Sequence, residues 1–202
     1  MKRSPLPHGD KELVQIVDAA LADAAQRSGH WLACRLGCTQ CCVGVFAINQ
    51  LDSVRLREGM SKLERSDPDR ANRLKTRVRE SVARLKATFP GNLSTGRLDE
   101  SPASQDLFDS YGNDEVCPVL DRDTGACDLY SHRPMTCRVF GPPVRSEDGL
   151  GICELCFVGA SDEEIATCEM KPDPDHLEEQ LVRKVEQSTG KSGDTIVAMC
   201  LR

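Results

Sequence analysis

"CRLGCTQCCVGVF", residues 34–46, is the most informative stretch of the chain, because it places four of the eleven cysteines within nine positions. In an α-helix successive residues turn by about 100°, so all four thiols would lie on one narrow face. A turn, which Gly37 and Gly44 permit, would also bring the thiols close together. Isolated buried cysteines often pack as small apolar residues. Four in one short run instead favour metal ligands: Cys34, Cys38, Cys41 and Cys42.

The overall composition indicates one domain that does not bind polyanions. The chain has 202 residues, a net charge of −6 and a pI of about 5.3. This length can bury a core, but an acidic surface does not attract nucleic acid or an anionic membrane. Aromatic residues make up only 4% of the chain, so the core must be mostly aliphatic. We therefore expect that the protein binds neither nucleic acid nor a membrane. The partners that we expect are a metal ion and a protein.

The use of cysteine points to a metal rather than to disulfides. The N-terminal sequence MKRSPLPHGD lacks the apolar run of a secretory signal, and no stretch approaches the ~20 apolar residues of a membrane span. These features predict a cytoplasmic protein. In the cytoplasm disulfides are rare and clustered cysteines more often bind metal or do redox work. An odd number of cysteines also fits a pure disulfide framework poorly.

Apolar periodicity and capping residues predict several helices. An apolar repeat at helical spacing follows Asp10, which can cap a helix over 10–28. A second amphipathic helix begins at Asn49. A third has Asp67 as its cap and Pro68 in its first turn. Because this third helix is heavily charged, we expect it to be peripheral.

The rest of the chain predicts irregular structure, a hairpin and further helices. Residues 91–114 are rich in Gly, Ser, Asp and Asn and are typical of a connecting loop. The turn-forming "DRDTG" predicts a β-hairpin within 117–130, and Ser161 with Glu164 forms a capping box. The predicted fold is mainly α, in a single domain over 1–202. An irregular, cysteine-rich metal-binding core spans about 30–170, with the helices 10–28 and 174–202 packed around it.

A second group of thiols lies in and after the predicted hairpin. Cys117 and Cys127 have the same strand parity and should project from one face. Cys137 follows on a short helix after Arg133-Pro134. Three thiols fall short of the usual four ligands of zinc or of an iron–sulfur cluster. The missing ligand is expected from the first cluster, or from Cys153 and Cys156 in "CELC".

Other residues near the cysteines have simpler interpretations. His30 and His132 are within reach of the cysteine groups, but we favour hydrogen-bonded surface histidines. Arg133 and Arg138 flank Cys137 and can neutralise the charge of thiolates. Cys200 lies in an apolar tail and is expected to pack in the core.

Three segments together resemble a known family. "CRLGCTQCC", "CPVLDRDTGACDLYSHRPMTCRVFGPP" and "GICELC" are similar to the bacterial YkgJ-like cysteine-cluster family, also described as the CxxCxxCC putative zinc- or iron-chelating domain. The resemblance covers about residues 30–170 and implies metal chelation. It implies these ligands: Cys38, Cys41 and Cys42, preceded by Cys34; then Cys117, Cys127 and Cys137; and a downstream cysteine chosen from Cys153, Cys156 and Cys168.

The resemblance does not decide the metal or the biochemical role. Adjacent residues such as Cys41 and Cys42 seldom both serve one tetrahedral ion but can serve a polynuclear centre, so we favour iron–sulfur over zinc. Some relatives are linked to lysine methylation of flagellin, but no methyl-donor site and no catalytic residue can be identified here. Three hypotheses remain: a metal-binding protein with a structural centre, an iron–sulfur enzyme or electron carrier acting in protein modification, and a thiol redox sensor.

Overall fold

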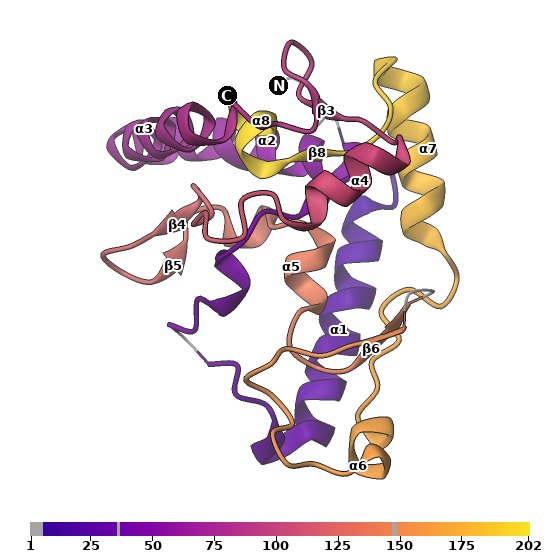
Figure 1. Cartoon of the computed structure of the whole chain (residues 1–202). Helices are drawn as coiled ribbons and strands as arrows, with labels where there is room; N and C mark the ends of the chain where they lie inside the picture. Colours follow the sequence, from indigo (N-terminus) through magenta and orange to yellow (C-terminus); the bar gives the residue numbers. More distant parts are fainter. Residues whose placement is uncertain (1–5, 36, 147–148) are drawn as a thin grey trace. The chain divides into compact units, whose positions relative to one another are not determined.

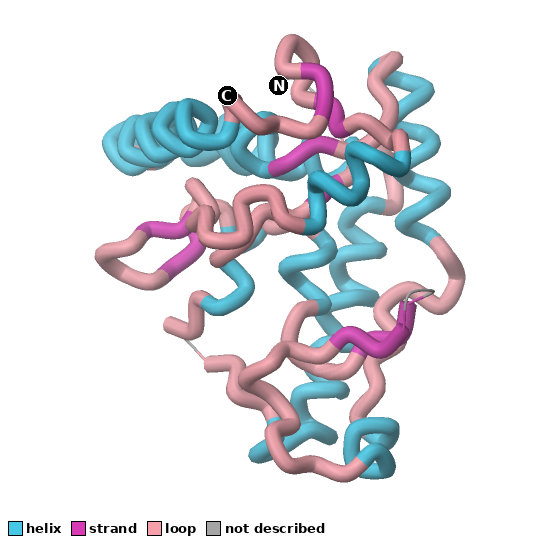
Figure 2. The backbone as a smooth tube through the Cα atoms, viewed as in Figure 1, coloured by secondary structure: helices cyan, strands magenta, loops and turns pink. Residues whose placement is uncertain are grey.

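The computed structural model describes residues 6–35, 37–146 and 149–202. In this part of the chain helices make up most of the regular structure and the strands are short (Figure 2). The predicted mainly helical fold is therefore confirmed. The chain divides into two compact units. The first unit contains Gly37–Pro134 and Val185–Arg202, and the second contains Pro7–Leu36 and Met135–Lys184. None of the helices in the described ranges is long and apolar enough to cross a membrane.

Three helices form the centre of the first unit (Figure 1): α2 (Gln50–Ser66), α3 (Pro68–Leu85) and α8 (Val197–Leu201). Helix α2 begins where the side chain of Asn49 accepts a hydrogen bond of 3.0 Å from the backbone N–H of Asp52. Helix α3 begins in the same way at Asp67, whose side chain accepts from the N–H of Arg70, and it has a proline in its first turn. Both predicted starts are confirmed, because a capping oxygen satisfies an otherwise unpaired N–H.

The core cluster between these helices has no buried aromatic member, whereas a second cluster of the same unit contains the buried rings of Phe89 and Tyr111. Helix α3 contributes the buried side chains of Leu74 and Val78 to the first of these clusters. Its charged residues cover the other face, so a helix of high charge still anchors the core. Each fully buried aliphatic side chain contributes about 1.5–3 kcal/mol. The other buried aliphatic members include Ile48, Leu56, Val119 and Val197.

In the described residues of the first unit the strands form three antiparallel pairs, and each strand has two residues: β1 (Ala47–Ile48) with β8 (Thr195–Ile196), β2 (Gly91–Asn92) with β3 (Arg97–Leu98), and β4 (Leu120–Asp121) with β5 (Ala126–Cys127). A short helix, α4 (Pro102–Asp109), lies between β3 and β4 along the chain. Two 3-10 turns, Gln40–Cys42 and Tyr130–His132, complete the unit.

The second unit is built around the long helix α1 (Asp10–Ser28), which contacts α5 (Met135–Val139). The buried Arg138 of α5 donates to both carboxylate oxygens of Asp18 in α1, at 2.8 and 3.0 Å. The remaining elements are the 3-10 turn Gly29–Trp31, the pair β6 (Val144–Ser146) with β7 (Gly149–Gly151), and α6 (Asp162–Thr167). Helix α7 (Leu177–Thr189) begins in this unit.

Several local predictions are confirmed and others are wrong. The hairpin appears at the predicted turn, and Ser161 and Glu164 form their capping box. The expected loop over 91–114 is wrong, because it contains β2, β3 and α4. The side chain of Asn92 accepts from the N–H groups of Ser94 and Thr95 and so closes a tight turn. The cap at Asp10 is also wrong: the N-cap of α1 is Gly9, without a side-chain hydrogen bond.

Candidate metal centre

The first cysteine cluster is not an α-helix. The backbone N–H of Cys42 donates to the carbonyl of Thr39 at 2.8 Å, and only Gln40–Cys42 forms a 3-10 turn. Gly44 has a φ of 94°, a left-handed conformation that favours glycine. Of the two conformations predicted for this stretch, the turn is therefore the one that the described residues adopt. It leaves Cys41 and Cys42 half-buried.

Backbone hydrogen bonds join this turn to the segment before the hairpin. The N–H of Cys117 donates to the carbonyl of Cys42 at 2.8 Å, and the N–H of Gly44 donates to the carbonyl of Glu115 at 2.9 Å. Between these bonds, Val43 and Val116 form an antiparallel bridge. Residues far apart in the sequence are thus held in a short two-stranded contact, which brings Cys42 beside Cys117.

The hairpin brings Cys127 to the same place. Cys127 lies in β5 and is paired with Leu120 of β4, whose N–H donates to the carbonyl of Cys117 at 3.0 Å. Cys117 therefore precedes β4 at a turn. The prediction that both cysteines project from one strand face is wrong, because only Cys127 lies in a strand. The turn nevertheless brings Cys117 close to the strand pair.

Cys38 lies in a segment beside the tip of the hairpin. A β-carbon added to Gly125 would lie 3.7 Å from the Cα of Gly37 and 3.9 Å from the side chain of Thr39. Cys38 stands between these two residues and is half-buried. The hairpin tip thus contacts the backbone on both sides of Cys38.

Four thiols of the first unit influence one another's ionisation. A hydrogen bond from the Cys42 thiol lowers the pKa of Cys41 to about 6, while the same bond raises the pKa of Cys42. Burial raises the pKa of Cys117 to about 12, and burial also raises the pKa of Cys127. Without a cation, these four thiols cannot all be thiolates at neutral pH, because the charges would be buried side by side. A coordinated metal ion reverses this, since a coordinating thiol is deprotonated.

The buried Arg133 supplies positive charge to this group. Its guanidinium lies 4.0 Å from the centre of the Tyr130 ring and donates to the Tyr130 carbonyl at 3.1 Å. Its charge lowers the pKa of Cys41 after the larger effects of hydrogen bonding and burial, and it acts in the same direction on Cys127. The direction of these effects agrees with the role that the sequence suggests for Arg133, which stays a prediction.

A buried carboxylate braces the segments that carry two of the thiols. The side chain of Asp128, next to Cys127, is only 1% exposed and accepts from Arg70 and Arg77 of α3. Arg77 also donates to the carbonyl of Pro118, next to Cys117, at 2.9 Å. One arginine therefore holds the residue after each of these two cysteines. Nothing in the sequence patterns predicted this brace.

The present arrangement of the described side chains does not form a metal-binding site. Among the described residues, no three His, Cys, Asp or Glu side chains stand in an arrangement that could hold a metal ion. The fold brings the cysteine-bearing segments together through the backbone hydrogen bonds and the hairpin described above. The donor set suits zinc or iron–sulfur chemistry, because both prefer thiolates.

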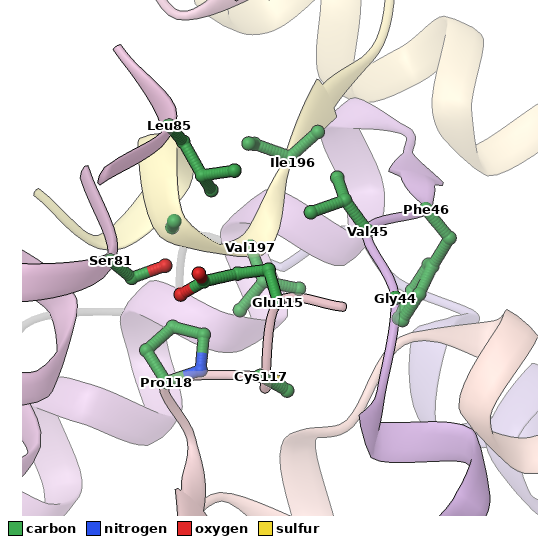
Figure 3. A pocket seen from close by; sticks show the side chains of 11 residues that line it. Gly44, Val45, Phe46, Ser81, Leu85, Glu115, Cys117, Pro118, Ile196 and Val197 are labelled. Atoms are coloured by element: carbon green, nitrogen blue, oxygen red, sulfur yellow. The ribbon is translucent and has the colours of Figure 1, made fainter. Parts of the chain in front are cut away.

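A small cavity of about 20 Å³ adjoins the thiol group. Its wall is mainly apolar and includes Val45, Ile196 and Cys117 (Figure 3). The carboxylate of Glu115 also faces it, and burial tends to raise the pKa of this group. Burial is the largest single effect, but two hydrogen bonds from Arg84, at 2.7 and 3.0 Å, together with Ser81 and the charges of Arg84 and Arg122, outweigh it, so the pKa of Glu115 is lowered. The cavity is about large enough for one water molecule.

The other predicted site residues belong to the second unit. Cys34 is exposed, Cys137 is half-buried in α5, and Cys153 and Cys156 are buried. Their sharing of a centre with the thiols of the first unit stays a prediction. Cys200 is buried in the core of the first unit and donates to the carbonyl of Ser53, so its predicted packing role is confirmed.

The two histidines that were considered as ligands have other neighbours. His30 is exposed and its ring centre lies 4.3 Å from that of Trp31. The Nε2 atom of His132 lies 3.1 Å from the Nζ atom of Lys62. Both contacts agree with the surface role that we favoured for these side chains.

Comparison with known proteins relates the cysteine-rich segments to a metal-chelating domain. A family model described as "CxxCxxCC: Putative zinc- or iron-chelating domain" matches residues 33–156, more than half of the chain. No curated protein and no solved structure matches the chain. The match supports metal binding by a cysteine cluster.

Proposed function

Because the chain belongs to the family of the CxxCxxCC putative zinc- or iron-chelating domain, we propose that its metal centre is built on the thiols of the first unit. The ligands are Cys41, Cys42, Cys117 and Cys127, with Cys38 beside them. The observation that carries this proposal is the hydrogen bond of 2.8 Å between Cys117 and Cys42, because it joins two cysteine-bearing segments that are distant in the sequence.

The surrounding residues would tune and support this centre. Four thiolates bring more negative charge than one divalent ion neutralises, and the guanidinium of Arg133 offsets part of the excess. Asp128 and Arg77 hold the backbone beside Cys127 and Cys117, in the way that outer residues orient ligands around a metal. The residues of this unit would thus bind and orient the metal group, which would supply structural cross-linking, and an iron–sulfur centre would in addition supply electron transfer.

We propose iron–sulfur as the metal group and keep zinc as the alternative. The adjacent Cys41 and Cys42 favour a polynuclear centre, since neighbouring residues seldom both bind one tetrahedral ion. In favour of zinc, four thiols are a complete tetrahedral set. Four predicted ligands remain. We propose that they either bind the same centre or form a separate one: Cys34, Cys137, Cys153 and Cys156.

The biological role that we propose is that of a cytoplasmic metal-binding protein that acts through a protein partner. An iron–sulfur enzyme or electron carrier is the alternative, and a thiol redox sensor is the third. Metal analysis separates the redox sensor, which needs no metal, from the other two hypotheses. An iron–sulfur protein that acts through a partner and an iron–sulfur enzyme contain the same metal group, so only an assay of activity separates these two. The proposal assigns no catalytic acid, base or nucleophile.

The test is elemental analysis of the whole chain after anaerobic purification. An iron–sulfur centre gives a brown protein with iron and sulfide, and a zinc centre gives a colourless protein with stoichiometric zinc. A well-folded protein that binds neither metal would overturn the proposal and leave the redox sensor.

Two substitutions test the ligand assignment. Cys127→Ser should lower the metal content strongly, because it removes a thiolate from the centre. Cys200→Ser is the control, since this thiol belongs to the same unit but is buried in its core and is not among the proposed ligands. Equal metal content in the two variants would contradict the assignment of Cys127.

A further inference from the structure

Helix α3 carries a row of exposed positive charges, and we propose that this basic row is the docking site for an acidic segment of a partner protein. The basic row consists of Lys75, Arg79 and Lys86, which are all exposed. An acidic segment is the chemical class of the protein partner that the proposed function requires, so the proposal rests on that function in this one respect. The charges of α3, and not the cysteines, recognise the partner.

Positive charge is concentrated in the α2–α3 part of an otherwise acidic chain. Residues 50–86 contain eleven basic and six acidic side chains, which give a net charge of +5. The rest of the chain has a net charge of −11, because the whole chain has −6. A surface that only keeps a protein in solution needs no such separation of the two signs. The local excess of positive charge therefore points to a negatively charged partner.

The three side chains of the basic row lie on one flank of α3. At about 100° per residue, they fall within about 40° of one another around the helix axis. Lys86 is the C-cap and keeps helical backbone angles, with φ −60° and ψ −29°, so it continues the row. At a rise of about 1.5 Å per residue the row is roughly 16 Å long. The buried side chains of Leu74 and Val78 hold the helix on the core and so fix the positions from which the row projects.

The opposite flank of α3 shows how this chain neutralises basic side chains. Arg70 and Arg77 pair there with the buried carboxylate of Asp128. Arg84 pairs with Glu115 at 2.7 Å. All three arginines of this flank thus have carboxylate partners within the same unit.

The basic row has fewer partners than the opposite flank. Lys75 pairs with Glu64 of α2 at 2.6 Å. Arg79 donates to the hydroxyl of Thr76 at 3.0 Å. In the part of the chain that the structure describes, neither Arg79 nor Lys86 forms an ion pair. Two of the three positive charges are therefore available to carboxylates of another molecule.

The spacing within the basic row is unfavourable in the free protein. Like charges four residues apart on a helix repel each other, and Lys75 and Arg79 have this spacing. Elsewhere the chain places opposite charges four residues apart, as in the pair of Glu58 with Lys62 in α2, and the same arrangement recurs in α1 and α7. A carboxylate of a partner beside Lys75 and Arg79 would replace the repulsion by attraction to both.

An acidic protein segment fits the basic row better than a nucleic acid does. The exposed neighbours of the row on α3 are Asn72, Thr76 and Ala83, which offer no ring on which a base could stack. The row has only three cations, and the remaining phosphates of a nucleic acid would meet a chain whose other residues carry a net charge of −11. Three carboxylates at the spacing of the row would pair with all three side chains.

Helix α3 also connects the basic row to the proposed metal centre. Arg77, on the opposite flank, binds Asp128 and the carbonyl of Pro118. These two residues directly follow two of the proposed ligands in the sequence. A partner bound to the basic row would thus dock on the helix that braces the thiol-bearing segments.

The test is fluorescence anisotropy of the whole chain with a labelled, alanine-rich helical peptide that carries three glutamates at the spacing of the basic row. A triple variant should bind this peptide roughly tenfold more weakly than the wild type, because it loses three exposed ion pairs. The same peptide with glutamine in place of glutamate should not bind. The variant combines Lys75→Gln, Arg79→Gln and Lys86→Gln.

The matched control removes three exposed basic side chains of the second unit: Lys171→Gln, Arg183→Gln and Lys184→Gln, of which Lys184 is the last residue of that unit. It has the same net charge as the triple variant and should keep the wild-type affinity for the peptide. Equal affinities of the triple variant and the control would overturn the proposal, and so would a wild type that does not distinguish the glutamate peptide from the glutamine peptide.

A charge exchange guards against misfolding of the triple variant. Arg79→Glu should lose affinity for the glutamate peptide and regain it for a peptide whose central glutamate is replaced by lysine; no recovery would overturn the assignment of Arg79. Both triple variants should keep the wild-type metal content, so a failure of peptide binding would leave the proposed metal centre standing. Two other results would overturn an acidic protein partner: tighter binding of the row to a DNA duplex than to the peptide, or a salt-sensitive dimer of the chain alone that the triple variant abolishes.

Discussion

Replacement of Asp128 by Asn should destabilise the first unit and weaken its metal centre. The carboxylate of Asp128 is 1% exposed and lies between the guanidinium groups of Arg70 and Arg77. Arg77 also donates to the carbonyl of Pro118. The substitution keeps the shape of the side chain but removes its charge, so two arginines lose their partner while the hairpin loses its anchor on α3.

The expected loss in the free energy of unfolding depends on how far Asp128 and its two arginine partners are buried. Removing one partner of a fully buried pair costs about 3–5 kcal/mol. The side chains of Arg70 and Arg77 are 35% and 22% exposed, so water can solvate part of their charge. The amide of Asn can also still accept a hydrogen bond. We therefore expect the free energy of unfolding to fall by about 2–3 kcal/mol, which lowers the Tm by roughly 4–12 °C for a chain of this length.

The assay combines thermal unfolding with a competition titration against a metal chelator. Asp123→Asn is the matched control, because Asp123 lies exposed in the same hairpin turn. The control should leave both the Tm and the metal affinity nearly unchanged. The Asp128 variant should lower the affinity as well, because Cys127 precedes the residue that loses its anchor.

Two results would contradict the role of Asp128 in the first unit. If Asp128→Asn unfolds at the same temperature as Asp123→Asn, the buried ion pairs do not stabilise the unit. If its Tm falls but its metal affinity stays equal to that of the wild type, the brace supports the fold without positioning the ligands.

Three further predictions concern packing, pH and metal removal. Gly59→Ala should lower the Tm, although alanine favours helices, because its β-carbon would lie 2.7 Å from two side-chain carbons of His132; an unchanged or higher Tm would contradict this contact. The pKa of Cys117 is raised to about 12 and that of Cys127 is also raised, so both thiols must lose a proton on binding. Metal affinity should therefore rise with pH between about pH 6 and 9, and a flat profile in competition titrations at several pH values would be inconsistent with these ligands. Chelation should lower the Tm and the near-ultraviolet circular dichroism of the cysteine-rich segments, while the far-ultraviolet signal of α3 and α7 should persist; identical melting curves with and without chelator would count against a stabilising metal.

Local features of this chain could be read from the sequence because they depend on residues close together along it. The caps at Asn49 and Asp67 each satisfy an N–H three residues later. The turn of "DRDTG" and the capping box at Ser161 are equally local. The cysteine pattern also identified the metal-chelating family, since the spacing of ligand residues is itself a property of the sequence.

Which of these local segments contact one another depends on the tertiary structure. The sequence contains 26 basic residues, and nothing local selects Arg77 as the one that binds both Asp128 and the carbonyl of Pro118. The same holds for the contact of Cys42 with Cys117, which depends on a backbone bridge between segments far apart in the sequence. Cysteines can be counted in a sequence, but their grouping depends on long-range hydrogen bonds and on burial, and these arise only when distant segments pack together.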